Sequence, residues 1–414
     1  MVPSDPVEEA VGQAFREEWG QVVALLIRVT GDWDLAEECA QDAFATALER
    51  WPRDGIPNRP GAWLTTTARN RAIDRLRREA VGAAKLREVA AMVDDVVQVS
   101  PADSDDVPDE RLRLMFTCCH PALAIEARVA LTLRTLAGLG TGEIARAFLV
   151  SEQTMQKRIA RAKQKIRNAA IPYRVPPAHL LPERTPAVLA VLYLLFNEGY
   201  TATTGADLIR RSLSAEAIRL TRVLAHLMPD EPEVSGLLAL MLLHDARSDT
   251  RQDAEGILIP LEEQDRTRWN APMIAEGIEI LETALRRREP GAYQIQAAIA
   301  ACHATAQSTA DTDWPQIAGL YNQLARYVPS PVVRLNQAVA IGMAEGPAAG
   351  LLLVDELVAS GTLTEYHLLP ATRADLLRRA GRYPEAAQAY RDALTKAITE
   401  PERAFLRRRI DEVS

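Results

Sequence analysis

The apolar residues of the chain recur with the 3.6-residue period of an α-helix rather than the two-residue period of a β-strand. One apolar face runs from Val22 to Val29, stops at the turn Gly31-Asp32, and resumes from Leu35 to Leu48. Ala, Leu, Arg and Glu dominate, aromatic residues make up only 5%, and β-branched alternation is nearly absent. The pattern therefore predicts an all-α fold.

Proline- and glycine-rich stretches divide this helical sequence into parts. A chain of 414 residues is too long for one ordinary core, so we expect several domains. The breakers place a first helical unit at 8–80, a linker at 81–108, a second helical unit at 109–172, and a C-terminal helical region at 183–414.

The second unit contains a predicted helix-turn-helix in GLGTGEIARAFLVSEQTMQKRIARAKQKIR, residues 138–167. Its first helix is expected from about Thr141 to Phe148, and Ser151 is a natural N-cap for the second. Small polar side chains lead the second helix and basic ones follow, which suits base-edge reading followed by phosphate contact. The candidate DNA contacts are Ser151, Glu152, Gln153, Thr154, Gln156, Lys157, Arg158, Arg161, Lys163 and Lys165. The alternative is a bundle helix with a solvated charged face.

The C-terminal region carries a long-period repeat. DWPQIAGLYNQLA at 313–325 aligns with RYPEAAQAYRDAL at 382–394, at an offset of 69 residues, with an intermediate copy at 345–357. Two units in that offset come close to the roughly 34-residue tetratricopeptide period. The repeat predicts a tetratricopeptide-like domain of helical hairpins, whose concave face would bind a protein partner or a ligand.

Charge is distributed unevenly along the chain, whose net charge is −8. Residues 68–79, ARNRAIDRLRRE, hold five arginines and two acids, and residues 151–167 hold six basic residues and one acid. Residues 94–110 between them hold seven acids and no base. Two basic segments on either side of an acidic linker indicate two separate nucleic-acid contacts.

The segment WLTTTARNRAIDRLRRE at 63–79 follows DLAEECAQDAFATALERW at 34–51 and precedes the linker and the helix-turn-helix. In this order the segments resemble the extracytoplasmic-function (ECF) sigma factors of bacterial RNA polymerase, over roughly residues 8–170. The first unit then corresponds to sigma region 2 and the second to sigma region 4. The C-terminal region, with LYLLFNEGYTATTG at 192–205, is similar to that of a subgroup with a tetratricopeptide-like extension.

The resemblance implies partners and contacts for both regions. Region 2 would bind the β′ clamp helices of core RNA polymerase through Glu37, Glu38, Gln41, Asp42 and Phe44. It would hold the −10 element of promoter DNA, including a flipped base beside the loop 56–61, through Pro57, Asn58, Arg59, Arg69, Asn70, Asp74, Arg75, Arg77 and Arg78. Region 4 would place the 151–167 helix on the −35 element while its apolar side meets the β flap.

The segment FNEGY at 196–200 has two interpretations. It is either a helix end, with Gly199 as the residue after the helix, or a regulatory docking segment. In the second case Phe196, Asn197, Glu198 and Tyr200 would dock the extension on the sigma regions or hold a ligand.

Other chemistry finds little support in the sequence. No nucleophile elbow, phosphate-binding loop or paired carboxylates appear, so we expect no enzyme, catalytic residue or cofactor. Cys118-Cys119-His120-Pro121 lacks the spacing of a metal site, which leaves helix-end packing or, less simply, redox sensing by the two thiols. The cysteine spacing, the acidic N-terminus and the absence of a 20-residue apolar run predict a cytoplasmic protein without membrane contact.

Two other classes of protein compete with the sigma factor interpretation. A one-component regulator would combine the helix-turn-helix with a helical domain that binds a ligand or partner, but it leaves residues 8–80 without a function. A scaffold protein with merely solvated basic segments leaves the helix-turn-helix unexplained.

Overall fold

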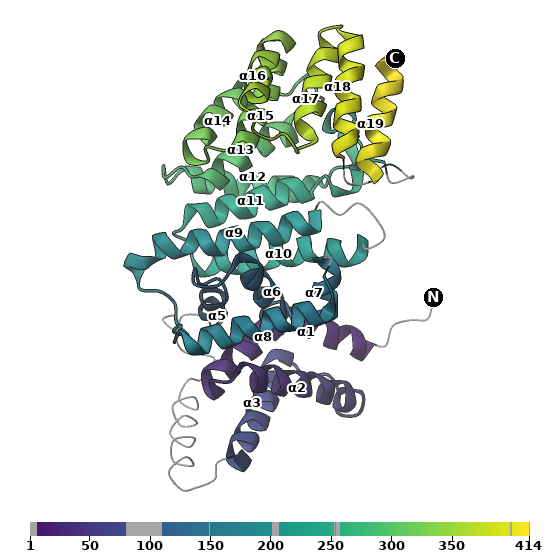
Figure 1. The fold of residues 1–414 in the computed structure, drawn as a ribbon. Helices are drawn as coiled ribbons and strands as arrows, with labels where there is room; N and C mark the ends of the chain where they lie inside the picture. The colour runs from purple at the N-terminus through teal and green to yellow at the C-terminus, as the bar shows by residue number, and fades with distance from the viewer. Residues whose placement is uncertain are drawn as a thin grey trace. The chain divides into compact units, whose positions relative to one another are not determined.

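The protein is described from a computed structural model that covers residues 6–79, 110–148, 150–200, 207–251, 253, 257–397 and 400–413. Over these residues the chain forms 18 α-helices and short 3-10 turns and no strand, which confirms the all-α prediction (Figure 1). The chain divides into two compact units, Met1–Leu195 and Phe196–Ser414. The predicted linker 81–108 lies outside the described residues.

The first unit begins with α1 (Pro6–Thr30), α2 (Trp33–Asp54) and α3 (Pro60–Glu79), which pack on one another. Asp32 caps the start of α2, because its carboxylate accepts hydrogen bonds from the backbone N–H groups of Asp34 and Leu35 in the first turn, at 2.8 and 3.1 Å. Gly55 ends α2 with a φ of 84°, a left-handed conformation that a residue with a side chain rarely adopts.

An aromatic cluster forms the core between α1 and α2. The ring of Phe44 lies 5.1 Å from that of Phe15 and 6.0 Å from that of Trp19, between centroids, and Phe44 is only 5% exposed. The resemblance places Phe44 at a polymerase surface, whereas its side chain is buried within the first unit. Phe44 therefore stabilises the fold and, in this arrangement, cannot touch a partner.

The second half of the first unit consists of α5 (Glu110–Cys118), α6 (Ile125–Thr135), α7 (Thr141–Ala147) and α8 (Glu152–Asn168). Helices α7 and α8 form the predicted helix-turn-helix and pack against each other. Ser151 caps α8, since its hydroxyl accepts a backbone hydrogen bond at 3.2 Å from the first turn. Both helix bounds and the cap confirm the sequence prediction.

The remaining helices follow one another to the C-terminus of the chain. They are α9 (Leu181–Tyr200), α10 (Asp207–Leu227), α11 (Pro232–Asp245), α12 (Ala271–Leu285), α13 (Ala292–Thr305), α14 (Trp314–Tyr327), α15 (Pro331–Glu345), α16 (Pro347–Ala359), α17 (Leu368–Arg379), α18 (Tyr383–Lys396) and α19 (Glu400–Val413). Because α9 continues through Gly199, the helix end expected at that residue is wrong.

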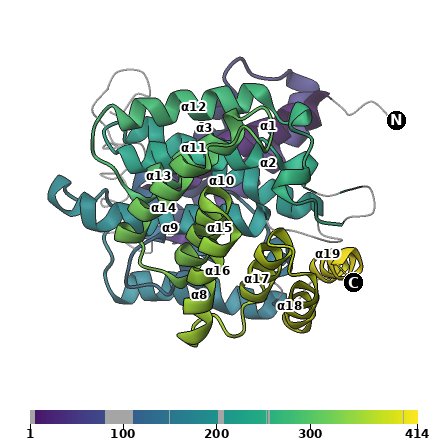
Figure 2. The same cartoon turned by 90° about the horizontal axis from the view of Figure 1, so that it is seen from above.

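The repeat seen in the sequence corresponds to repeated helix starts. Trp314, Pro347 and Tyr383 are the first residues of α14, α16 and α18. Figure 2 shows α14 to α19 following one another in order, and each packs on the next. The repeated segments are therefore equivalent helices in a chain of neighbours that pack one on the next.

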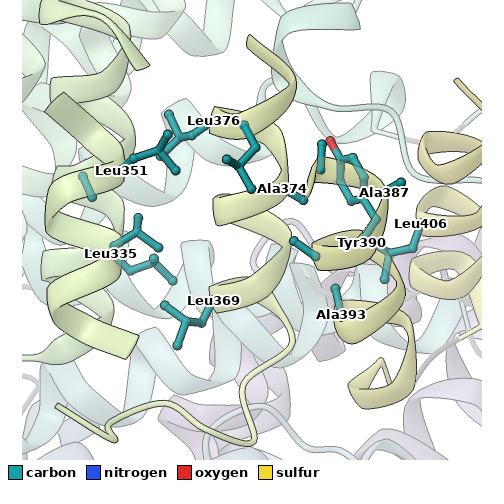
Figure 3. Packing of buried hydrophobic residues seen from close by; sticks show 14 of the residues in the cluster. Leu335, Leu351, Leu369, Ala374, Leu376, Ala387, Tyr390, Ala393 and Leu406 are labelled. Atoms are coloured by element: carbon teal, nitrogen blue, oxygen red, sulfur yellow. The ribbon is translucent and has the colours of Figure 1, made fainter. Parts of the chain in front are cut away.

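A continuous apolar core joins these last helices. Leu335, Leu351, Leu376, Tyr390 and Leu406 come from α15, α16, α17, α18 and α19, one from each helix, and all are buried (Figure 3).

Glycines bring the backbones of α15 and α16 into contact. A Cβ atom at Gly350 would lie 2.7 Å from the carbonyl oxygen of Ala338 and 2.9 Å from the Cα of Gly342. No side chain fits at this crossing, so the two helices pack as one block.

The burial of Phe44 predicts a large loss of stability on truncation. Phe44→Ala is expected to lower the free energy of unfolding of the first unit by about 3–5 kcal/mol, because the cluster loses a buried ring. Urea denaturation followed by tryptophan fluorescence measures this, since four of the six tryptophans (Trp19, Trp33, Trp51 and Trp63) lie in that unit. The control Leu48→Ala, on the same helix and 48% exposed, is expected to change stability by less than about 0.5 kcal/mol. Equal losses for the two variants would contradict the assignment of Phe44 to the core.

Candidate nucleic-acid interface

Helix α8 presents a polar and basic face to solvent. Its apolar residues Met155, Ile159, Ala162 and Ile166 are buried, which fixes the orientation of the helix. The predicted −35 contacts that are exposed are Ser151, Glu152, Gln153, Thr154, Gln156, Lys157, Arg161 and Lys165, while Arg158 is half-buried. The leading turn of the helix is therefore open to a base edge, as a recognition helix requires.

Lys163 departs from this pattern, because its side chain is buried against α2. Its Nζ lies 2.8 Å from Asp34 Oδ1 and 2.8 Å from Glu37 Oε1. The other oxygen of Glu37 accepts a hydrogen bond of 2.9 Å from Arg134 Nε, and Arg134 Nη1 donates to the carbonyl of Leu139 at 3.1 Å. We call Asp34, Glu37, Arg134 and Lys163 the Lys163 network.

Two residues that were predicted to contact other molecules thus form an ion pair with each other in the described arrangement. Lys163 was expected on DNA and Glu37 on polymerase, yet both lie in the network, and Lys163 and Glu37 are only 4% and 6% exposed. Asp34 and Arg134 complete it and were not singled out from the sequence. In the sequence, each of these two residues is only a charged residue beside an apolar helical face, and such residues are ordinarily exposed to water.

Close backbone contacts join the first and second predicted regions near the network. A Cβ at Gly20 of α1 would lie 2.9 Å from the carbonyl oxygen of Leu136, which follows α6. The Tyr173 hydroxyl donates to the carbonyl of Ala24 at 2.8 Å, and its ring packs edge-on against Trp33. Burial raises the pKa of Tyr173 well above its usual value, so the hydroxyl stays a donor. The two regions therefore form one packed unit.

The arginines of α3 do not all face solvent. Arg71 donates to Asp42 Oδ2 at 2.9 Å and to Thr46 Oγ1 at 2.7 Å. Arg75 Nη2 donates to Glu38 Oε1 at 2.7 Å, and this hydrogen bond lowers the pKa of Glu38. The basic residues facing α2 are thus paired with carboxylates that were predicted to face polymerase.

The other side of α3 remains open. Asn70, Asp74, Arg77 and Arg78 are exposed and share one helical face, while Arg69 is half-buried. These five residues, together with the paired Arg75, are the α3 residues predicted to hold the −10 strand.

The loop before α3 is also accessible. Asn58 and Arg59 are exposed, Pro57 is half-buried, and Ile56 is 43% exposed. Trp63 lies half-buried beside this loop, where it packs edge-on against the buried Trp51 at 5.6 Å between centroids. The loop thus presents an apolar side chain and polar groups to solvent, next to the packed pair of tryptophan rings.

The outer side of α2 carries an exposed stripe. Glu38, Gln41 and Leu48 lie along one face and are exposed, and Asp42 beside them is half-buried. Leu48 was missed from the sequence, because it follows the buried Phe44 by four residues and periodicity alone assigns it to the core.

The two vicinal thiols are enclosed between α5 and α6. Cys118 Sγ lies 3.3 Å from Thr135 Oγ1, and Cys119 Sγ lies 3.7 Å from Thr132 Oγ1. Burial raises the pKa of Cys119 to about 12 and raises that of Cys118 as well, so both thiols stay protonated. A redox sensor needs an accessible thiolate, which this packing disfavours.

The described residues hold neither a metal-ligand cluster nor a membrane-spanning helix. They contain no group of three or more His, Cys, Asp or Glu side chains placed to hold a metal ion. No helix among them is long and apolar enough to cross a membrane.

The segment predicted to regulate the sigma regions has partners inside the second unit. Phe196 is buried, and the ring of Tyr200 stacks on it at 5.3 Å between centroids. The guanidinium of Arg251 lies 3.8 Å from the centre of the Tyr200 ring. Asn197 is half-buried, and the side chain of Glu198 lies outside the description.

Comparison with known families places two of the predicted regions. Residues 15–81 match Sigma-70 region 2, and residues 113–166 match Sigma-70 region 4. Residues 184–285 match a family of unknown function, DUF6596.

Relatives fall into two kinds. An uncharacterized protein of Rhizobium meliloti is 43% identical over 397 residues, which cover 95% of this chain and 93% of the relative. The ECF RNA polymerase sigma factor SigK of Mycobacterium bovis is 31% identical over 166 residues, or 39% of this chain and 86% of SigK. SigK of Mycobacterium ulcerans is 30% identical over 152 residues, or 36% of this chain and 79% of that protein.

Two Sigma-70 regions in this order, with a helix-turn-helix in the second, define a DNA-binding factor of transcription initiation. The chain belongs to the ECF RNA polymerase sigma factor family and carries an additional C-terminal helical extension. The resemblance seen in the sequence is thereby confirmed for the sigma factor part.

The Lys163 network predicts unequal effects of two neighbouring lysines. Lys163→Met is expected to lower the free energy of unfolding of the first unit by about 2–4 kcal/mol, because the buried Glu37 keeps only Arg134 as a cationic partner. The exposed Lys165→Met serves as the matched control and is expected to change it by less than about 0.5 kcal/mol. Urea denaturation of both variants measures the difference. If Lys163→Met is as stable as Lys165→Met, the network does not hold the regions together.

Proposed function

We propose that the protein binds core RNA polymerase and directs it to promoters through −10 and −35 elements, without catalytic activity of its own. The observation that carries this proposal is the exposed polar leading turn of α8 within a region 4 match that follows a region 2 match. A one-component regulator would leave the match at residues 15–81 without a function.

For the −35 element, we assign base reading to the start of α8. Gln153, Thr154 and Lys157 are exposed in its first two turns and carry the donors and acceptors that base edges require. Arg161 and Lys165 lie further along the helix and are suited to phosphate contact. Lys163 reaches DNA only if its network with α2 opens.

For the −10 element, we assign strand binding to the loop at 56–61 and the open face of α3. Asn70, Asp74, Arg77 and Arg78 line that face, and the loop offers Asn58 and Arg59. Flipped bases need such an accessible pocket with polar edges.

For polymerase, we assign the outer stripe of α2 to the β′ clamp helices. Glu38 and Gln41 supply acceptors and Leu48 supplies an exposed apolar anchor, a combination typical of interfaces. The β flap would meet region 4 in the same complex.

The length of a promoter indicates that the first unit must open. The −10 and −35 elements lie about 25 base pairs apart, which corresponds to about 85 Å at 3.4 Å per base pair. The longest helix among the described residues of the unit, α1, has 25 residues and is therefore about 37 Å long. Since α3 packs on α1 and α2, and α8 is tied to α2 by Lys163, the described arrangement is a closed one. We propose that promoter binding breaks the Lys163 network.

We further propose that the C-terminal extension regulates this opening as a tetratricopeptide-like domain. Support comes from the repeated helix starts and from a chain of helices that each pack on the next. Such a chain exposes a long surface to partners while its core remains intact.

The assignment of α8 predicts two classes of variant. Gln153→Ala, Thr154→Ala and Lys157→Ala are expected to change the preferred −35 sequence, each lost base contact costing about 1–3 kcal/mol. Lys165→Ala is expected to weaken all promoters alike and to reduce the salt dependence of binding. In vitro transcription with core polymerase on a library of −35 variants distinguishes them. An unchanged preference in all three of the first class would refute the docking of α8.

The proposed regulation predicts that removing the extension changes transcription. A chain cut after Ile171 retains both matched sigma regions, and we expect it to transcribe a target promoter at a rate several-fold different from that of the full chain. Tyr200→Ala should give part of this effect, because it removes the ring that Phe196 and Arg251 contact. Multi-round transcription at equal protein and core concentrations measures both. Equal rates for the cut and full chains would show the extension to be passive.

A further inference from the structure

A cavity of about 370 Å³ lies inside the second unit, among α13, α14, α15, α17, α18, α19 and the 3-10 turns at Leu261–Glu263 and Arg266–Arg268. Its apolar walls include Trp314, Ile317, Tyr321, Val339, Met343 and Leu376. A volume of this size suits a small molecule, and apolar walls with a few polar groups are typical of ligand sites. Leu376 and Tyr390, labelled in Figure 3, place the cavity beside the apolar core of the last helices.

Most charged groups on the cavity wall neutralise one another. Asp375 accepts hydrogen bonds from Arg378 at 2.6 Å and from Arg379 at 2.7 Å, and Glu262 pairs with Arg379. Arg409 pairs with Glu263 at 2.6 Å and with Glu412 at 2.7 Å. Neither acid that lines the cavity, Glu262 or Asp375, is therefore left to attract a cationic ligand.

Arg266 is the exception on this wall. It donates to the carbonyl oxygens of His303 and Ala306 at 2.7 Å each, and to Thr312 Oγ1 at 3.3 Å. All three acceptors are neutral, and Arg266 forms no ion pair with a described carboxylate; Asp311 attracts it only over a longer distance. These bonds use three of its five N–H donors, and the Trp269 ring lies 5.1 Å from the guanidinium carbon, so two donors remain for an anionic group.

The titratable side chain nearest to Arg266 on the cavity wall, His303, does not supply a counter-charge. His303 also lines the cavity, and its buried Nδ1 has no hydrogen-bond partner among the described residues. Burial, with the nearby Arg247 and Arg266, lowers the pKa of His303 to about 4, so the ring is neutral at pH 7. A half-buried cation without a counterion is costly, and a bound anion would remove that cost.

We propose that this cavity binds a small molecule with an apolar body and one carboxylate, whose carboxylate pairs with Arg266. The body would lie against Trp314, Ile317 and Met343. An uncharged ligand would leave the guanidinium without a counterion, and a cationic one would be repelled by it. This ligand site is independent of the promoter and polymerase contacts proposed above. If those contacts were disproved, the proposal of a ligand site would still stand.

The first test compares two probes of equal chain length on the full protein. Isothermal titration calorimetry with decanoate is expected to show saturable binding at one site per chain, at concentrations where the probe stays monomeric. Decylammonium is expected to bind at least about tenfold more weakly, because it lacks the charge-assisted hydrogen bond to Arg266. Absence of saturable decanoate binding, or equal affinity for both probes, would overturn the proposal.

Two variants locate the binding in the cavity. Arg266→Gln is expected to weaken decanoate at least about tenfold, whereas Arg334→Gln, an exposed arginine of α15 outside the cavity, should leave affinity unchanged. Val339→Trp fills the cavity from a half-buried position and should abolish binding, whereas Leu352→Trp on the exposed side of α16 should not. Thermal melts confirm that each variant is folded. Unchanged decanoate binding by Val339→Trp would place the probe elsewhere and refute the site.

Discussion

The contact between the two sigma regions depends on buried charges that satisfy one another. Lys163 from α8 meets Glu37 and Asp34 from α2, and Arg134 holds the second oxygen of Glu37. Such networks add little net stability compared with apolar packing, but losing one partner is costly. They therefore specify which surfaces pack together. When the surfaces separate, each charge can be solvated by water or can pair with another charged partner. A contact of this kind fits the opening on DNA that we propose, because it defines the closed arrangement and can still be broken.

The same principle changes the interpretation of the basic run in α3. Its arginines suggest a strongly positive DNA surface, yet Arg71 and Arg75 are paired with Asp42 and Glu38 on α2. Exposed pairs of this type are weak, so phosphates can compete for those arginines. The positive charge that α3 offers to a DNA strand is therefore smaller in the described arrangement than the sequence suggests, and the polymerase contact proposed for α2 would increase it.

Local features were predictable from the sequence, and long-range burial was not. The helix period and the Ser151 cap determine the bounds of the helix-turn-helix, because both act within a few residues. Lys163 and Glu37 lie 126 residues apart, and no local pattern indicates that each buries the other. For the same reason Phe44 was predicted at the surface and Leu48 in the core. The burial of each side chain depends on the helices that pack around it, which the local pattern does not reveal.

The glycine crossing of α15 and α16 has a mechanical consequence. Because the backbones touch at Gly342 and Gly350, there is no soft layer of side chains between the helices to absorb a displacement. Met343 of α15 lines the cavity, and Leu352 and Val358 stand exposed on α16. A displacement of α15 at the cavity wall therefore moves α16 with it. The position of the exposed apolar side chains on α16 is thereby coupled to the volume of the cavity.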